Sequence, residues 1–292
     1  MIVVVKNNLK NKIMQGNIHQ LQKQKGSRMR LHTLTLLIIT AISTIAAQEL
    51  SITIVTPTYN NAAYCVRNMQ SVVDQTYPHW NMIIINDCST DATSERIHAY
   101  VQQHGLASKI TIIDNAQRKG ALQNLYETIH QCDDNTIIMT LDGDDWFATN
   151  WALERVAQTY QDNKTWITYG QFIWYPAGIK GFCRPFPPEI IKYKQFRSYH
   201  WISSHLRTFY AWLFKKIAQE DLMYENKFLP MAWDVAMMLP MLEMASDGHI
   251  TCIEDILYVY NDDNPLNDHK KDLALQRELG AFVASKPAYP TL

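Results

Sequence analysis

The feature that most constrains the fold is an alternation of short apolar strand patterns with helix patterns between residues 51 and 141. Strands are indicated over residues 52–56, 82–85, 110–113 and 136–141. In the segments between them, apolar side chains recur every three to four residues, as Ile97, Tyr100 and Val101 do. This alternation predicts an α/β fold, in which helices cover a parallel sheet.

The second half of the chain has a less regular pattern. A strand is indicated over residues 167–173, residues 175–188 predict a loop or hairpin, and helix-like aromatic material follows. The 292 residues allow one large domain or two smaller ones. Because no linker pattern separates the halves, we predict one domain over residues 51–284 and a loose C-terminal tail over residues 285–292.

Residues 1–50 differ from the rest and resemble a leader. Basic residues at positions 23–30 precede an apolar run over residues 34–45, and Ala46 and Ala47 offer a small-residue cleavage site. The run is shorter than the roughly 20 residues of a membrane-spanning helix. A translation start at Met29 or a dispensable leader is the alternative. The protein is expected to be exported or membrane-associated if residues 29–47 are a signal or an anchor, and otherwise cytoplasmic.

Composition excludes several classes of protein. Hydrophobic residues make up 47% and charged residues 19% of the chain, which excludes a disordered protein. The 27 basic and 28 acidic residues nearly cancel, so no nucleic acid is expected as a partner. The five cysteines lie far apart, without the close pairs of a zinc site or a small disulfide scaffold, and are expected to be buried thiols.

The most informative cluster is the segment 141–145 (LDGDD), where an apolar strand ends directly in three carboxylates. Ligands of open α/β sheets bind beyond the carboxyl ends of the strands. A hard cation such as Mg²⁺ or Mn²⁺ would neutralise carboxylates packed this closely, and Gly143 would let the backbone approach. The alternative is an ordinary Asp-Gly turn in which Asp144 or Asp145 caps the next helix.

Two further clusters follow apolar strands in the same way. In the segment 86–91 (NDCSTD), Asp87 can accept a hydrogen bond from a base or a ribose, while a neighbouring side chain caps the next helix. In the segment 56–60 (TPTYN), Pro57 fixes a turn and Tyr59 offers an aromatic ring. Helix capping and an ordinary strand-to-helix turn are the respective alternatives.

Four segments in this order and spacing resemble the family 2 glycosyltransferases, which are inverting sugar-nucleotide enzymes with the GT-A fold. The segments are 55–60 (VTPTYN), 84–91 (IINDCSTD), 115–124 (NAQRKGALQN) and 141–145 (LDGDD). The resemblance covers about residues 51–151. It implies a Rossmann-like catalytic domain with a mixed, mostly parallel sheet and helices on both faces.

The resemblance also assigns roles to individual residues. Pro57, Tyr59, Asp87 and Arg118 would bind the nucleotide part of the donor, with Asp87 facing the base. Asp142 and Asp144 would hold a Mn²⁺ or Mg²⁺ ion, and Asp142 would also contact the donor. A metal that bridges the diphosphate stabilises the negative charge growing on the leaving group.

Three positions in two segments depart from the family pattern. The family usually has Asp-Asp-Gly-Ser where this chain has residues 86–89 (NDCS), so that one acid and one flexible residue are replaced. Similar members carry an acid-Asp pair where this chain has Trp233 and Asp234. The first departure makes the preference for a base less certain than the retained Asp87 alone would suggest.

An inverting transfer needs a base that takes the proton of the acceptor hydroxyl. Asp234 is the only charge in the apolar segment 228–239 and is our candidate, with helix capping as the alternative. The segment 203–214 resembles an acceptor-side segment of related members. In it, Arg207 could bind the donor diphosphate or an anionic acceptor, and His205 could bind a hydroxyl or a phosphate.

Other aromatic and polar residues of the second half have two interpretations. Tyr199, Trp201, Tyr210 and Trp212 form either a sugar-stacking platform or internal packing. The segment 258–269 predicts a strand followed by a polar loop, in which His269 contacts metal or phosphate or the loop is an exposed turn. The exposed turn is favoured.

We therefore predict a metal-dependent inverting glycosyltransferase that moves one sugar from a nucleotide-sugar donor, with UDP-sugar favoured, to a glycan, lipid-linked or protein acceptor. Glycan or cell-surface polysaccharide synthesis is the expected setting, without a multi-pass membrane domain. One alternative is a sugar nucleotidyltransferase, which the lack of a Gly-rich phosphate loop after the first strand disfavours. The other is a catalytically silent sugar- or nucleotide-binding protein.

Overall fold

The computed structural model describes residues 50–292, which form one compact unit. The predicted leader, apart from Leu50, lies outside the described residues. The strands are β1 (Ile52–Thr58), β2 (Trp80–Asn86), β3 (Ile110–Asp114), β4 (Ile137–Thr140), β5 (Trp146–Phe147), β6 (Ile167–Tyr175), β7 (Ile179–Lys180), β8 (Arg207–Tyr210), β9 (Met223–Tyr224), β10 (Lys227–Phe228) and β11 (Ile250–Asn261).

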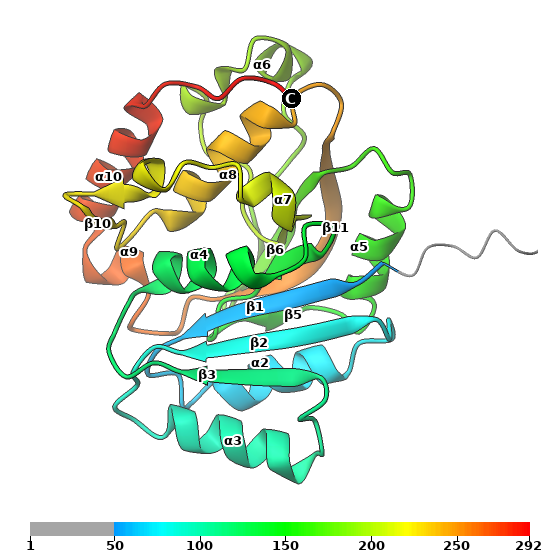
Figure 1. The fold of residues 1–292 in the computed structure, drawn as a ribbon, viewed down its shortest axis with the longest axis vertical. Coiled ribbons are helices and arrows are strands. Elements are labelled where there is room, and N and C mark those ends of the chain that lie inside the picture. The colour runs from blue at the N-terminus through cyan, green and yellow to red at the C-terminus, as the bar shows by residue number, and fades with distance from the viewer. Residues whose placement is uncertain (1–49) are drawn as a thin grey trace, which may run out of the picture. The chain divides into compact units, whose positions relative to one another are not determined.

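The helices follow the strands on either side of the sheet (Figure 1). The α-helices are α2 (Cys65–Val73), α3 (Thr93–Gln103), α4 (Ala121–Gln131), α5 (Ala152–Tyr160), α6 (Pro188–Lys192), α7 (Ala211–Phe214), α8 (Trp233–Met244), α9 (Asp268–Lys271) and α10 (Leu273–Ser285). Two short 3-10 helices are η1 (Gln195–Arg197) and η2 (Gln219–Leu222).

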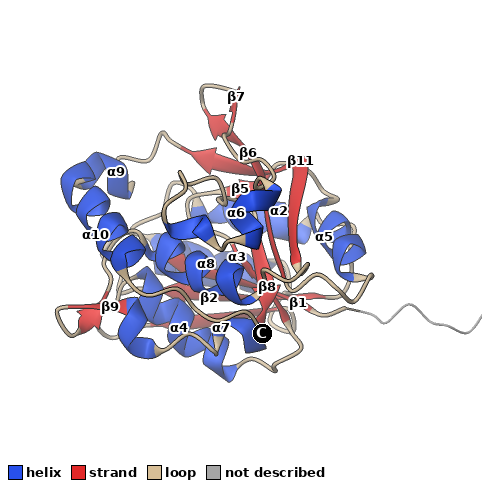
Figure 2. Cartoon of the chain, turned by 90° about the horizontal axis from the view of Figure 1, so that it is seen from above, coloured by secondary structure: helices blue, strands red, loops and turns tan. Residues whose placement is uncertain are grey.

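The main sheet has the strand order β3-β2-β1-β4-β8-β6-β11-β5, with β7 paired to β6. The pairs among β3, β2, β1 and β4 are parallel, whereas β8 is antiparallel to both of its neighbours. Figure 2 shows β7 next to β6 at the top of the view. The predicted fold class, a mixed, mostly parallel sheet with helices on both faces, is confirmed.

Each face of the sheet carries its own hydrophobic core. On one face, α4, α7, α8 and α10 contribute buried side chains such as Leu125, Phe214 and Met238. On the other face, α2, α3 and α5 contribute side chains such as Met69, Ile97 and Val156. Because both faces are covered, the strands read as continuous apolar runs, and β1 is buried along its whole length.

The segment around residue 207 differs from the prediction. We expected helix-like material there, but β8 is a central strand, and only the four residues of α7 are helical. The ring of Tyr210 contacts Tyr160, and the ring of Trp212 contacts Trp166. Both residues also pack against the hydrophobic cores, which supports internal packing, the second of the two interpretations, for Tyr210 and Trp212.

The C-terminal segment after α10 is held in place, contrary to the expectation of a loose tail. The Tyr289 hydroxyl donates to Asp221 Oδ2 at 2.6 Å, and the Tyr289 N–H donates to Glu243 Oε2 at 2.9 Å. The Leu292 N–H donates to the carbonyl of Met244 at 3.1 Å. Within residues 50–292, every helix is too short or too polar to cross a membrane.

Candidate functional site

The carboxyl ends of β1, β2 and β4 meet at one edge of the sheet, and a cavity opens there to solvent. This edge is where open α/β sheets bind their ligands. The residues to which the sequence assigns a role with the donor, the metal or the acceptor proton all line the cavity. They are Pro57, Tyr59, Asp87, Arg118, Asp142, Asp144, Arg207 and Asp234, with His205 and His269 beside them.

Tyr59, Asp87 and Arg118 form one wall of the cavity. Arg118 Cζ lies 3.8 Å from the centroid of the Tyr59 ring, and Arg118 Nε lies 3.9 Å from Asp87 Oδ2. Asp87 accepts hydrogen bonds from Asn115 Nδ2 at 2.9 Å and from the backbone N–H groups of residues 119–120 at 2.8 Å. Burial alone would raise the pKa of Asp87, but these hydrogen bonds outweigh it and lower the pKa. Asp87 is therefore an ionised acceptor at neutral pH.

The two unusual residues beside Asp87 are accommodated locally. Asn86 Nδ2 donates to Asp114 Oδ1 at 2.7 Å, a contact that a second carboxylate at position 86 would turn into repulsion. Cys88 has φ of 62°, in the left-handed region that favours glycine. Both departures therefore change residues next to Asp87, while the Asp87 carboxylate itself still lines the cavity.

The loop after β4, residues 142–145, is called the acidic loop below. Side chains that are distant in sequence hold it in place. The Tyr258 hydroxyl donates to Asp145 Oδ2 at 2.6 Å and accepts from the Asp142 N–H at 3.2 Å. The Asn261 N–H donates to Asp145 Oδ1 at 2.7 Å. From α2, Asn68 Nδ2 donates to the carbonyls of Asp142 and Asp145 at 2.9 and 2.8 Å. Both oxygens of Asp145 are thus engaged in holding the loop.

Gly143 lets this loop lie against β1. A Cβ atom at position 143 would overlap the side chain of Thr58, so that only glycine fits without a shift. The close approach predicted from the sequence is therefore present. It brings the carboxylates of Asp142 and Asp144, on either side of Gly143, to the carboxyl end of β1.

The polar segment 258–269 is part of the site. The expectation that it is an exposed turn is therefore wrong. Asn264 Nδ2 donates to Asp144 Oδ2 at 2.6 Å and to Asn61 Oδ1 at 3.2 Å. Asn267 Nδ2 donates to the carbonyl of Asn261 at 2.9 Å. Three asparagines spaced three residues apart are buried, namely Asn261, Asn264 and Asn267. That spacing is the one sequence signal that could have pointed to this network.

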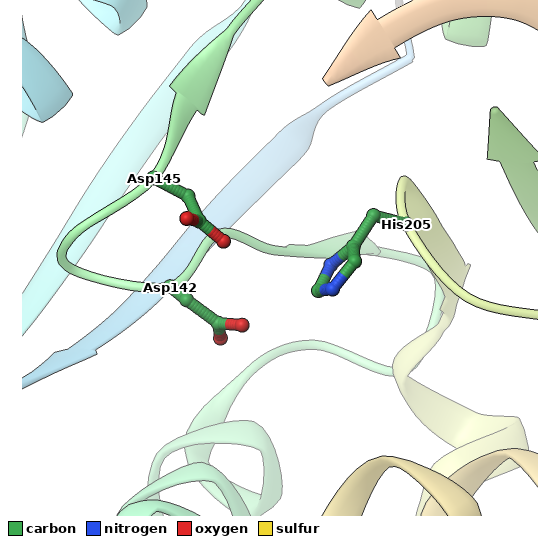
Figure 3. A group of neighbouring side chains, drawn as sticks. All are labelled: Asp142, Asp145 and His205. Carbon is green, nitrogen blue, oxygen red and sulfur yellow. The ribbon is translucent and has the colours of Figure 1, made fainter. Parts of the chain in front are cut away.

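One group of side chains has the composition of a metal site. Figure 3 shows Asp142, Asp145 and His205 turned toward one another, and one ligand atom of each lies within 4.8 Å of the others. His205 is buried, and its Nδ1 has no hydrogen-bond partner among the described residues. Burial, assisted by the charge of Arg207, holds the pKa of His205 well below its ordinary value. The imidazole is therefore neutral, as a metal ligand must be.

Asp144, which the sequence paired with Asp142 as a metal ligand, is not a member of that group. It lines the cavity beside it and accepts from Asn264. Burial raises the pKa of Asp144. Burial, with repulsion from Asp144 and Asp234, outweighs the effect of Arg207 and raises the pKa of Asp142 to about 7. A divalent cation would relieve this concentration of buried carboxylates, so the donor set fits Mn²⁺ or Mg²⁺.

Asp234 is held opposite the acidic loop by Arg207. Arg207 Nη1 lies 3.4 Å from Asp234 Oδ2, and Arg207 Nη2 lies 3.5 Å from Asp142 Oδ2. Helix α8 begins at Trp233 with Ala232 in the cap position, so the alternative that Asp234 caps this helix is wrong. The Asp234 carboxylate remains about one quarter exposed, with 26% of its side chain accessible.

Removing the hydroxyl of Tyr258 should destabilise the acidic loop. We expect Tyr258→Phe to lower the free energy of unfolding by about 1–3 kcal/mol, because buried Asp145 loses a hydrogen-bond donor. Urea unfolding of the two proteins measures the difference. Tyr126→Phe is the matched control, since its exposed hydroxyl makes only a long 3.5 Å contact with Gln219, and it should change stability by less than about 0.5 kcal/mol. Equal effects of the two substitutions would contradict the bracing role.

Comparison with known proteins agrees with this arrangement. Residues 53–222 match the family described as Glycosyl transferase family 2. TuaG of Bacillus subtilis (strain 168), named for teichuronic acid biosynthesis, is 45% identical over 49 residues, which are 17% of this chain and 19% of TuaG. TarS 1–349 of S. aureus in complex with UDP-GlcNAc has a TM-score of 0.55 at 16% identity, over 76% of this chain and 61% of TarS 1–349.

A third comparison concerns a structure that contains a metal. The mannosyltransferase PcManGT from Pyrobaculum calidifontis, in complex with GDP-Man and Mn²⁺, has a TM-score of 0.53 at 15% identity, over 81% of this chain and 65% of that protein. The matched regions thus span less than two thirds of each of these relatives. The structural likenesses show a shared fold. Since the family match covers more than half of the sequence, this chain belongs to glycosyl transferase family 2.

Proposed function

We propose that this protein transfers one sugar from a nucleotide-sugar donor, with a UDP-sugar favoured, to an acceptor hydroxyl with inversion at the anomeric carbon. One observation carries the proposal. A single cavity brings together an ionised base-reading carboxylate (Asp87), a cluster of buried carboxylates suited to a cation (Asp142 and Asp144) and a partly exposed carboxylate on another element (Asp234). Donor recognition, charge neutralisation and proton removal each have a candidate group there.

The nucleoside wall supports recognition of a base that carries an N–H group. The ring of Tyr59 offers a stacking surface, and Arg118 already lies over it. Asp87 is an acceptor-only group when ionised, and among the described residues its Oδ2 accepts from the backbone N–H of Gly120. An acceptor there favours uracil, whose ring N–H can donate, over a base that offers only a lone pair at that position. Binding of UDP-GlcNAc by TarS 1–349 is consistent with this choice.

Asp234 is proposed as the general base. It would accept the proton of the acceptor hydroxyl while that oxygen forms a bond to the anomeric carbon and the bond to the donor diphosphate breaks. Attack from the side opposite the leaving group inverts the configuration. Mn²⁺ or Mg²⁺ held by Asp142 and Asp144 would supply neutralisation of the diphosphate. Asp142 and Asp144 would position the donor, and Asn264 would keep Asp144 in place.

The acceptor is proposed to be a glycan, a lipid-linked sugar or a protein, in the synthesis of a glycan or cell-surface polysaccharide. The relationship to TuaG, which is named for teichuronic acid biosynthesis, supports this setting. The side of the cavity near Asp234 is lined by Pro230, Trp233 and Tyr260. Aromatic rings at this place would suit the apolar face of a sugar ring.

The decisive experiment measures release of nucleotide by the full chain from a panel of UDP-, GDP-, CDP- and dTDP-sugars, with Mn²⁺ or with EDTA. We expect Mn²⁺-dependent release from one UDP-sugar and from none of the CDP-sugars. Turnover of a single GDP-sugar would support the proposed transfer reaction but show that the preferred base is guanine and not uracil. Binding of a nucleotide by calorimetry without any turnover would instead support a silent binding protein.

A further inference from the structure

Arg207 is a buried cation at the centre of the site. Its side chain is 1% exposed, although a guanidinium buried without partners is very costly. Its Nε donates to Thr140 Oγ1 at 3.3 Å, and its two terminal nitrogens contact Asp234 and Asp142. Its Cζ lies 4.8 Å from the centroid of the Trp233 ring. Three sides of the guanidinium therefore face protein groups.

The backbone of Arg207 is anchored in the middle of the sheet. It is the first residue of β8, and it stands opposite Thr140, the last residue of β4. The acidic loop begins two residues after Thr140, whereas Asp234 lies on α8. Arg207 thus connects the element that carries Asp142 with the element that carries Asp234, from a position that cannot move without the sheet.

We propose that Arg207 is a positioning residue, which fixes the carboxylate of Asp234 at a set place relative to Asp142. This inference rests on the proposed function, because the placement has value only if Asp234 acts on an acceptor beside the donor. It replaces the direct contact with the donor diphosphate that the sequence suggested for Arg207. The planar fork suits the task, since a guanidinium can hold two carboxylates at once in a fixed geometry.

The contacts of Asp234 show what the loss of Arg207 would change. Asp234 Oδ2 faces Arg207, and Asp234 Oδ1 accepts from the N–H of Val235, next to it in the chain. Without the cation, Asp234 and Asp142 face each other as like charges, and Asp234 keeps only its local hydrogen bond. We expect its carboxylate to turn away from the acidic loop toward solvent.

A cycle of substitutions tests the contact without any need for turnover. Thermal unfolding is compared for the wild type, Arg207→Gln, Asp234→Asn and the double variant. We expect Arg207→Gln to lower Tm by about 4 °C or more. We also expect the decrease in Tm caused by Asp234→Asn to be at least about 2 °C smaller in the Arg207→Gln background than in the wild type. Arg197→Gln is the matched control, because Arg197 pairs with Glu243, which lies on α8 as Asp234 does. Its effect should add to that of Asp234→Asn. Equally additive effects for Arg207→Gln would overturn the proposal.

Kinetics and binding separate positioning from contact with the diphosphate. We expect kcat for transfer to fall about 10- to 100-fold in Arg207→Gln, with the donor KM within about 3-fold, and Arg207→Lys to recover only part of the loss. The ratio of the affinities for UDP and uridine, measured in EDTA, should stay unchanged. A collapse of that ratio would assign Arg207 to the diphosphate and overturn the positioning role. A wild type that turns over no donor would refute the proposed function, while the unfolding cycle would still decide whether Arg207 holds Asp234.

Discussion

Asp234→Asn is expected to lower the rate of sugar transfer by about 100- to 10,000-fold while leaving nucleotide affinity within about 3-fold of the wild type. The substitution keeps the size of the side chain and an oxygen that can accept from the Val235 N–H. It removes the group that takes a proton from the acceptor. Since the donor would bind at the other side of the cavity, beside Asp87 and the acidic loop, its binding should persist.

The measurement is kcat with a saturating donor and the acceptor identified in the donor screen, together with calorimetry of UDP and Mn²⁺. Asp247→Asn is the matched control, because Asp247 is exposed and lies in the turn after α8. It should retain full transfer. If Asp234→Asn transfers sugar at the wild-type rate, another carboxylate must serve as the base. Asp268 would then be the next candidate, since it also lines the cavity and burial, with repulsion from Asp234, raises its pKa to about 6.

The sequence was informative where the fold is local. Strands β1 and β4 are buried on both faces and β2 is buried at most positions, so their apolar runs stand out, and each ends at the carboxyl edge where the polar clusters begin. Connections by helices then leave few possible sheet topologies. For this reason the sequence alone could predict both the parallel half of the sheet and the grouping of Asp87 with Asp142.

Strand β8 could not be found in the same way. It is only four residues long and begins with Arg207, a charge that apolar patterns exclude from a central strand. The charge is tolerated because Thr140, Asp142 and Asp234 meet it from other elements. Such a compensation depends on residues up to 67 positions away in the chain, and local periodicity carries no record of it.

The burial of the segment 258–269 could not be predicted for a related reason. Asn and Asp next to Pro265 are typical of exposed turns, because their side chains satisfy the local backbone. Here Asn264 instead reaches Asp144, 120 residues earlier in the chain, and is buried by doing so. The acidic loop has more acceptors than its own backbone can satisfy, and the C-terminal segment supplies the donors. Polarity alone therefore predicted the opposite of the observed burial.

The second large effect concerns the metal. We expect Mn²⁺ to raise Tm of the wild type, and Asp144→Ala to remove both that increase and all metal-dependent turnover, a loss of at least about 100-fold. The matched variant is His205→Ala, which removes the imidazole of the group in Figure 3. If His205→Ala abolishes the Mn²⁺ effect while Asp144→Ala retains it, the cation lies between Asp142, Asp145 and His205, and the choice of Asp144 is wrong.

The same carboxylates should make the metal effect depend on pH. In the metal-free protein, burial and neighbouring carboxylates raise the pKa of Asp142 to about 7, above the value of about 4 in an unfolded chain. The folded state therefore binds protons more tightly than the unfolded state, and this group makes the metal-free protein less stable as pH rises from about 4 to about 7. Mn²⁺ competes with those protons, so its increase in Tm should be larger at pH 8 than at pH 5.5. In Asp142→Asn the metal-free protein should lose this decline, and an unchanged pH profile would show that Asp142 is not the titrating group.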